Sequence, residues 1–120
     1  MNPRPGEVWM ADLGFAAKFR PVVIVSRQDP DPPRALIIYV PLTTQDRGSP
    51  YEVRLPKTRF LEKGSVANVQ GLASLPTVRL GRRLGLLSAE TMSEIKKAIA
   101  WALELEPTQT PPTPEGTGQA

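Results

Sequence analysis

The clearest strand signal in this chain is the segment Arg20-Pro21-Val22-Val23-Ile24-Val25-Ser26. Its β-branched run, which begins at Val22, is typical of a strand buried on both faces. A second buried strand is predicted from Ala35 to Leu42, and it leads directly into two hydroxyls and an amide at residues 43–45. Each of the two strands therefore carries polar side chains at one of its ends.

The remaining strands are shorter, and one helix follows them. Alternation and flanking turn residues predict four strands: Val8–Ala11, Tyr51–Leu55, Ser65–Val69 and a weaker one in Val78–Leu87 that Gly81 and Gly85 interrupt. Residues 88–104 predict an amphipathic helix with Ser88 as its N-cap. Its apolar face is made of Met92, Ile95, Ile99, Ala102 and Leu103. Five or six strands before one helix indicate a mainly β fold, a small twisted barrel of SH3-like kind.

The chain length of 120 residues indicates one domain, and we assign residues 1–106 to it. Residues 107–120 contain four prolines and two glycines with almost nothing to bury, so we expect a disordered tail. The longest apolar run, residues 35–42, is too short to span a bilayer. The N-terminus shows no charged head before an apolar stretch, and we therefore expect a cytoplasmic protein without membrane contact.

Two residue types are absent from the sequence, cysteine and histidine. Without cysteine there is no disulfide, no thiol catalysis and no sulfur-based zinc site. Without histidine the commonest general base and the commonest metal ligand are missing. We therefore expect neither a metal nor another cofactor. The net charge of +3 and the pI of about 9.6 favour anionic partners without proving one.

Arg20 is the first candidate for chemistry. The proline that follows restricts it to an extended conformation at the entrance of a strand, and a guanidinium group is well shaped for a phosphate. The alternative is a surface arginine that pairs with Glu7 or Asp12. Thr43 and Thr44 come next: strand alternation turns one of them inward and the other outward, and with Gln45 they form a hydrogen-bonding edge. Two threonines at a strand end are also common β-formers.

Basic residues are numerous around these positions, among them Lys18 and Arg47. They could line a groove for an RNA strand, with Phe15, Phe19 or Tyr51 as stacking surfaces. The alternative is scattered surface charge, because acidic residues are interleaved with the basic ones.

Several spaced segments resemble the MazF/PemK family of toxin endoribonucleases. The first two are Arg4-Pro-Gly-Glu-Val-Trp-Met-Ala-Asp-Leu and Arg20-Pro-Val-Val-Ile-Val-Ser. Val40-Pro-Leu-Thr-Thr-Gln and Gly48-Ser-Pro-Tyr-Glu-Val-Arg-Leu are similar to the next part of the family pattern. Ser65-Val-Ala and Leu87-Ser-Ala-Glu-Thr-Met are similar to the last part. The resemblance covers about residues 4 to 105 in order, and such agreement between separate segments is a strong signal of the fold.

The resemblance implies a dimeric toxin of a type II toxin–antitoxin pair that cuts single-stranded RNA without metal. In such toxins the ribose 2′-hydroxyl attacks the adjacent phosphate and leaves a cyclic phosphate and a 5′-hydroxyl. Arg20 would stabilise the phosphorane and could act as an acid, and Thr43 would bind the scissile phosphate. The substrate-binding residues implied are Lys18, Thr44, Gln45, Arg47 and Gln70.

The sequence departs from the family pattern at two places. The loop from Leu13 to Phe19 is short, and the usual Asp/Glu-Gln pair near the fifth strand is here Gln70-Gly71, with Ala73 in place of a basic residue. These departures leave open whether RNA binding is weaker, differently specific or lost. Two alternatives share the fold: a non-catalytic barrel that binds nucleic acid or a protein, and a gyrase poison like CcdB. The second needs a C-terminal aromatic end, and this chain ends in Gly-Gln-Ala.

Overall fold

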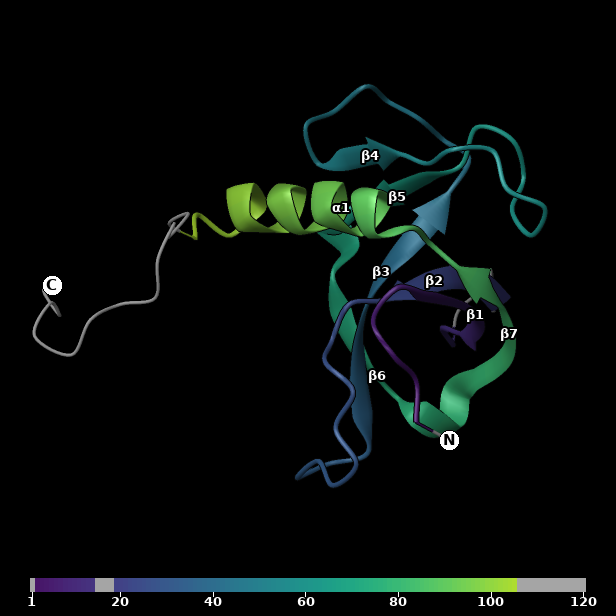
Figure 1. The fold of residues 1–120 in the computed structure, drawn as a ribbon, viewed down its shortest axis with the longest axis vertical. Coiled ribbons are helices and arrows are strands. Elements are labelled where there is room, and N and C mark those ends of the chain that lie inside the picture. Colours follow the sequence, from purple (N-terminus) through teal and green to yellow (C-terminus); the bar gives the residue numbers. More distant parts are fainter. Residues whose placement is uncertain (1, 15–18, 106–120) are drawn as a thin grey trace, which may run out of the picture.

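The computed structural model describes residues 2–14 and 19–105. That part of the chain forms seven strands, two short 3-10 turns and one helix (Figure 1). The elements are β1 (Glu7–Asp12), β2 (Phe19–Ile24), β3 (Leu36–Thr43), β4 (Glu52–Arg54), β5 (Val66–Asn68), η1 (Val69–Gly71), β6 (Ala73–Pro76), η2 (Thr77–Arg79), β7 (Leu80–Leu86) and α1 (Ala89–Ala102).

All strands belong to one antiparallel sheet with the order β4-β5-β3-β2-β1-β7. The long strand β3 organises this sheet, because β6 also pairs with it, along its first half. The sheet is strongly twisted and barrel-like, but within the described residues its end strands β4 and β7 do not pair with each other. The predicted mainly β fold with one C-terminal helix is confirmed, in an open form of the barrel.

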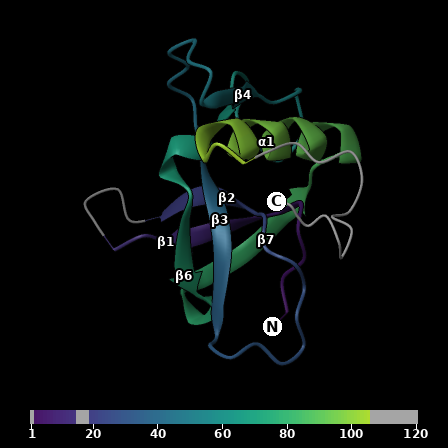
Figure 2. The same ribbon diagram turned by 90° about the vertical axis from the view of Figure 1, so that its left-hand side faces the viewer.

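The two faces of the sheet bury two separate apolar clusters, because neighbouring strand residues point to opposite faces. One cluster contains Val23, Val40 and Leu42 and is covered by α1. The other contains Val22, Tyr39 and further side chains of β1, β6 and β7. Arg20 lies two residues before Val22 and therefore belongs to the second face. Figures 1 and 2 show α1 running across the sheet, with β4 on one side of it and β1, β2 and β7 on the other.

The helix begins where its sequence predicts. The Ser88 hydroxyl accepts a hydrogen bond from the Thr91 backbone N–H at 3.1 Å, which caps the first turn. Met92 and Ile95 are buried against the sheet. The inclusion of Leu103 in the buried face was wrong, since that side chain is 53% exposed at the end of the helix.

Three strand predictions were wrong in detail. β2 begins at Phe19 and ends at Ile24, so Arg20 is part of the strand rather than a residue at its entrance. β7 runs unbroken through Gly81 and Gly85, although its pairing with β1 is irregular between Gly85 and Arg83 and again between Arg83 and Leu80. The first half of β3 is not buried on both faces, because Leu36 and Ile38 are 41% and 44% exposed.

β6 was not predicted at all. Its residues Ala-Ser-Leu-Pro carry no β-branched signal, and the strand exists because it pairs with β3 from Leu36 to Tyr39. The predicted tail at residues 107–120 lies outside the described residues. Among those described, no helix is both long and apolar enough to cross a membrane.

Candidate active site

The register of the sheet brings the two predicted catalytic residues together. β2 and β3 are antiparallel and pair Val22 with Pro41. The pairing ends there, and Arg20 and Thr43 lie two residues beyond it, at the ends of both strands and on the same face. Both side chains line the same two cavities of the protein. One anionic group can therefore contact both side chains.

Arg20 is exposed and is held by an extended backbone that Pro21 restricts. The alternative that it pairs with Glu7 or Asp12 was wrong. The Glu7 carboxylate is engaged by Arg83 at 3.1 Å and by Arg4 at 3.6 Å, and the Asp12 carboxylate accepts the Gly14 backbone N–H at 2.9 Å. Within residues 2–14 and 19–105, no ion pair or hydrogen bond occupies the Arg20 guanidinium, which leaves it available for a ligand.

Thr43 and Thr44 differ as alternation predicts: Thr43 is half-buried and Thr44 is exposed. The Thr43 hydroxyl oxygen accepts the Gln45 backbone N–H at 3.1 Å. Since this bond uses a lone pair of the oxygen, the hydroxyl hydrogen remains free to be donated. Thr43 can therefore donate a hydrogen bond to an acceptor atom of a ligand that binds beside Arg20.

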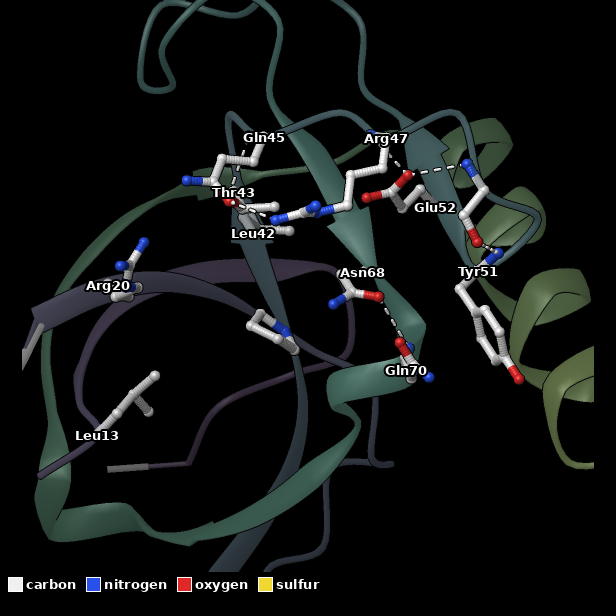
Figure 3. A pocket seen from close by; sticks show the side chains of 12 residues that line it. Leu13, Arg20, Leu42, Thr43, Gln45, Arg47, Tyr51, Glu52, Asn68 and Gln70 are labelled. Atoms are coloured by element: carbon white, nitrogen blue, oxygen red, sulfur yellow. Dashed lines mark hydrogen bonds between the residues drawn. The ribbon is translucent and has the colours of Figure 1, made fainter. Parts of the chain in front are cut away.

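A cavity of about 560 Å³ opens beside this pair (Figure 3). Gln45 and Arg47 enter it from the loop between β3 and β4, while Asn68 and Gln70 enter it from β5 and η1. In the view of Figure 3, Thr43 is seen between the guanidinium groups of Arg20 and Arg47. The cavity is therefore lined by two cations and several hydrogen-bonding groups.

A second cavity, of about 320 Å³, also has Arg20 and Thr43 in its wall. Its other lining residues include Thr44, Phe60, Glu62 and Arg82. Because Arg20 and Thr43 line both cavities, a strand of linked nucleotides could pass across them with one nucleotide on each side.

The structure brings most of the predicted site residues together. Five of them line the first cavity: Arg20, Thr43, Gln45, Arg47 and Gln70. Thr44 lines only the second cavity, and Lys18 lies outside the described residues. The sequence reasoning missed Asn68 and Glu52, which reach the first cavity. The signal for them is the sheet register, which pairs Glu52 with Asn68 across β4 and β5.

The Gln70-Gly71 step has a steric explanation. A Cβ atom at Gly71 would stand 2.6 Å from the Pro41 ring, which is closer than real Cβ contacts allow. The Asn68 side chain accepts the Gln70 backbone N–H at 3.1 Å and caps the short turn η1. Glycine therefore lets the backbone of η1 pack on β3, and Gln70 is the side chain that this turn contributes to the cavity.

The aromatic residues proposed for stacking do not share one environment. Tyr51 makes an edge-on contact with Trp101, with ring centroids 5.0 Å apart, which ties the loop before β4 to α1. Phe19 is 60% exposed at the start of β2, and Phe15 lies outside the described residues. Of the two that the structure describes, Tyr51 lines the first cavity and Phe19 does not.

One acidic side chain lines each cavity, Glu52 the first and Glu62 the second. In the part of the chain that the structure describes, no three acidic residues come together in a way that could hold a metal ion. The donors that line the two cavities are guanidinium, hydroxyl and amide groups, which suit an anionic or neutral polar ligand.

Comparisons with known proteins identify the family of this chain. Residues 4–103 match the family described as PemK-like, MazF-like toxin of type II toxin-antitoxin system. Endoribonuclease MazF3 of Mycobacterium tuberculosis (strain ATCC 25618 / H37Rv) is 32% identical over 89 residues, which is 74% of this chain and 86% of that protein. Endoribonuclease MazF4 of the same strain is 34% identical over 103 residues, 86% of this chain and 94% of that protein.

A solved structure gives the same assignment. An endoribonuclease in complex with its cognate antitoxin, from a mycobacterial species, superposes with a TM-score of 0.76 at 31% sequence identity. The match covers 88% of this chain and 99% of that one. Since the family pattern spans most of the chain and these relatives exceed 30% identity, the chain belongs to the PemK-like, MazF-like toxins of type II toxin–antitoxin systems.

Proposed function

We propose that this chain is the toxin of a type II toxin–antitoxin pair and acts as an endoribonuclease on single-stranded RNA, without a metal. The observation that carries the proposal is that Arg20 and Thr43, at the ends of neighbouring strands, share the wall of two cavities. Family membership and the names of the relatives support the reaction class. We place the activity in the cytoplasm, where transcripts are translated.

The proposed reaction uses the RNA as its own nucleophile. The 2′-hydroxyl loses its proton as its oxygen forms a bond to phosphorus, the bond from phosphorus to the 5′-oxygen breaks, and the 5′-oxygen takes up a proton and leaves as a hydroxyl. One proton therefore moves in net from the 2′-oxygen to the 5′-oxygen, and no water is consumed. Negative charge grows on the non-bridging oxygens of the phosphate in the transition state. Arg20 and the free hydroxyl hydrogen of Thr43 would donate to those oxygens, and preorganised donors of this kind are often the largest catalytic contribution. We assign Arg20 this electrostatic role because a guanidinium group keeps its proton.

The product chemistry tests this proposal. A panel of labelled single-stranded RNAs is incubated with the protein in EDTA, and the fragments are examined for 2′,3′-cyclic phosphate and 5′-hydroxyl ends. We expect cleavage that persists in the chelator and stops when the ribose at the cleavage site is replaced by 2′-deoxyribose. Cleavage that requires magnesium, or that survives the deoxy substitution, contradicts the mechanism. If no RNA is cut, the second reading stands: a barrel that only binds nucleic acid or protein.

We propose a homodimer as the assembled form and a cognate antitoxin as its protein partner. The end of α1 leaves Trp101 and Leu103 more than half exposed, and Leu105 continues this apolar surface. Such a surface favours protein contact over solvent. Light scattering at micromolar concentration should give about twice the chain mass of 13.1 kDa. A monomer at that concentration would count against the dimer.

A further inference from the structure

The loop between β3 and β4, residues 44–51, is held by side chains rather than by strand pairing. One carboxylate oxygen of Glu52 accepts the backbone N–H groups of both Arg47 and Ser49, each at 3.0 Å. The Glu52 backbone N–H donates in turn to the Ser49 carbonyl at 2.9 Å. Glu52 thus closes the turn around residues 47–49 from both its side chain and its backbone.

A second carboxylate holds the outer side of the same loop. Asp46 accepts the Gly48 backbone N–H at 2.9 Å and the Arg54 side chain at 2.7 Å. The hydrogen bond from Gly48, and then the one from Arg54, lower the pKa of Asp46, so the group is an anion at neutral pH. Gly48 itself has φ of +67°, which only glycine adopts without strain. The loop therefore has one defined conformation.

The conformation of this loop determines where the Arg47 side chain lies in the first cavity. Arg47 extends from the held loop over the cavity, and its guanidinium group lies 3.4 Å from the Gln45 side-chain oxygen (Figure 3). The Gln45 backbone in turn donates to the Thr43 hydroxyl. A chain of contacts thus runs from Glu52 through Arg47 and Gln45 to Thr43.

We propose that Glu52 is a positioning residue, which fixes Arg47 so that its guanidinium group binds the RNA phosphate next to the scissile one. This inference rests on the proposed function. A negative charge in a cavity that accepts a polyanion weakens binding by repulsion. Held in place, Arg47 contributes a planar, charged donor without the entropy cost of ordering an eight-residue loop. Positioning therefore offsets the repulsion that the carboxylate causes.

The charge of Glu52 should lower the affinity for RNA, and its positioning of Arg47 should raise that affinity. Because the two effects have opposite signs, substitutions can separate them. Glu52→Gln removes the charge but keeps an oxygen that can accept both backbone N–H groups. Glu52→Ala removes the charge and the hydrogen bonds together. Glu94→Ala is the matched control, because it removes an exposed carboxylate of α1 that lines neither cavity.

The measurement is the dissociation constant for an RNA that the wild type cuts, made uncleavable by a single 2′-deoxy residue at the mapped site. We expect Glu52→Ala to weaken binding about tenfold, the scale of one charge-assisted hydrogen bond. Glu52→Gln should bind the RNA as well as the wild type or more tightly, and Glu94→Ala should bind it as well as the wild type. The cleavage rate of Glu52→Ala at saturating all-ribose RNA should change less than its affinity does.

A double-variant cycle with Arg47→Ala completes the test. If Glu52 acts through Arg47, the two alanine substitutions together should cost no more affinity than Arg47→Ala alone. Both single variants should also lower the slope of log affinity against log salt by about 0.7, the loss of one phosphate contact on a single strand. Additive losses, or tighter binding by Glu52→Ala, overturn the inference.

A substitution on the exposed side of the loop provides a second test of the positioning role. If Glu52→Ala does not fold, Asp46→Ala loosens the same loop, and it should weaken RNA binding although it removes a negative charge. Tighter binding by Asp46→Ala then rejects the positioning role. If the wild type cuts no RNA, the proposed function is rejected instead. If the wild type cuts RNA and Glu52→Ala binds it normally, only this inference is rejected.

Discussion

Arg20 and Thr43, on neighbouring strands, line both cavities of the candidate active site. The two residues are 23 positions apart in the chain, and the antiparallel pairing of β2 with β3 brings the ends that carry them together. Their chemistry is complementary, since Arg20 supplies a permanent charge and Thr43 a neutral donor whose oxygen is already oriented by Gln45. This pairing makes their contributions testable one at a time.

The hydroxyl of Thr43 should matter more than its shape. Thr43→Val keeps the branched side chain and removes the donor, and we expect RNA cleavage to slow by about 10- to 100-fold, the value of one hydrogen bond to a charged group. Thr43→Ser keeps the donor and should stay within about fivefold of the wild type. Equal rates for the valine variant and the wild type would exclude a donor role.

Gly85 should not tolerate a side chain, because the Phe60 ring occupies the space that the side chain would need. A Cβ atom at Gly85 would stand 2.4 Å from the ring. We expect Gly85→Ala to lower the free energy of unfolding by about 1–3 kcal/mol, as overpacking commonly does. Urea unfolding measures the change.

The matched control for that substitution is Gly81→Ala on the same strand. A Cβ atom there would meet its nearest neighbour, the Met10 carbonyl oxygen, at an ordinary 3.5 Å. We expect a change within about 0.5 kcal/mol. Adding Phe60→Leu should recover part of the loss caused by Gly85→Ala. If Gly81→Ala proves as damaging as Gly85→Ala, the contact with Phe60 is not the cause.

Glu7 should give the protein part of its resistance to acid. Burial raises the pKa of Glu7, but hydrogen bonds from the Arg4 backbone, the Trp9 indole and Arg83, together with the Arg83 charge, outweigh burial and hold it below the ordinary value of 4.5. A lowered folded-state pKa stabilises the fold at pH values above the unfolded pKa. This stabilisation is lost as the pH falls from about 4.5 through the folded-state pKa.

Urea unfolding of the wild type and Glu7→Gln at two pH values tests this. At pH 7 the wild type should be the more stable of the two, because only it has the charged partner for Arg83. Near pH 3 the gap should narrow, since protonation progressively removes the same charge. A gap that stays constant between the two pH values would show that the Glu7 charge does not contribute.

The parts of the fold that local sequence determines were predictable. The apolar run of β2 and the capped, amphipathic helix each carry their signal within a few residues, and Ser88 caps the helix as its sequence predicts. β6 lacks such a signal, because its pairing with β3 joins residues more than 30 positions apart. The exposure of Ile38 also depends on which residues α1 covers, and α1 lies far along the chain.

The candidate site was predictable to a similar extent. Arg20 and Thr43 were candidates from their residue types and their places at strand ends, with a surface arginine and a β-forming threonine as the alternatives. The resemblance to a family then implied their catalytic roles. Asn68 and Glu52 have no local signal, because only cross-strand register brings them into the cavity. Register is set by many weak contacts across the sheet, and one strand's sequence does not contain it.

The most direct test of the account compares the effects of Arg20→Ala on cleavage and on binding. Single-turnover cleavage of a labelled RNA is measured at saturating protein, and affinity is measured separately with the 2′-deoxy form of that RNA. If Arg20 neutralises charge that appears only in the transition state, the cleavage rate should fall about 10²–10³-fold while the affinity changes much less. Cleavage by Arg20→Ala at the wild-type rate, or a rate that falls only in step with the affinity, would contradict the central claim.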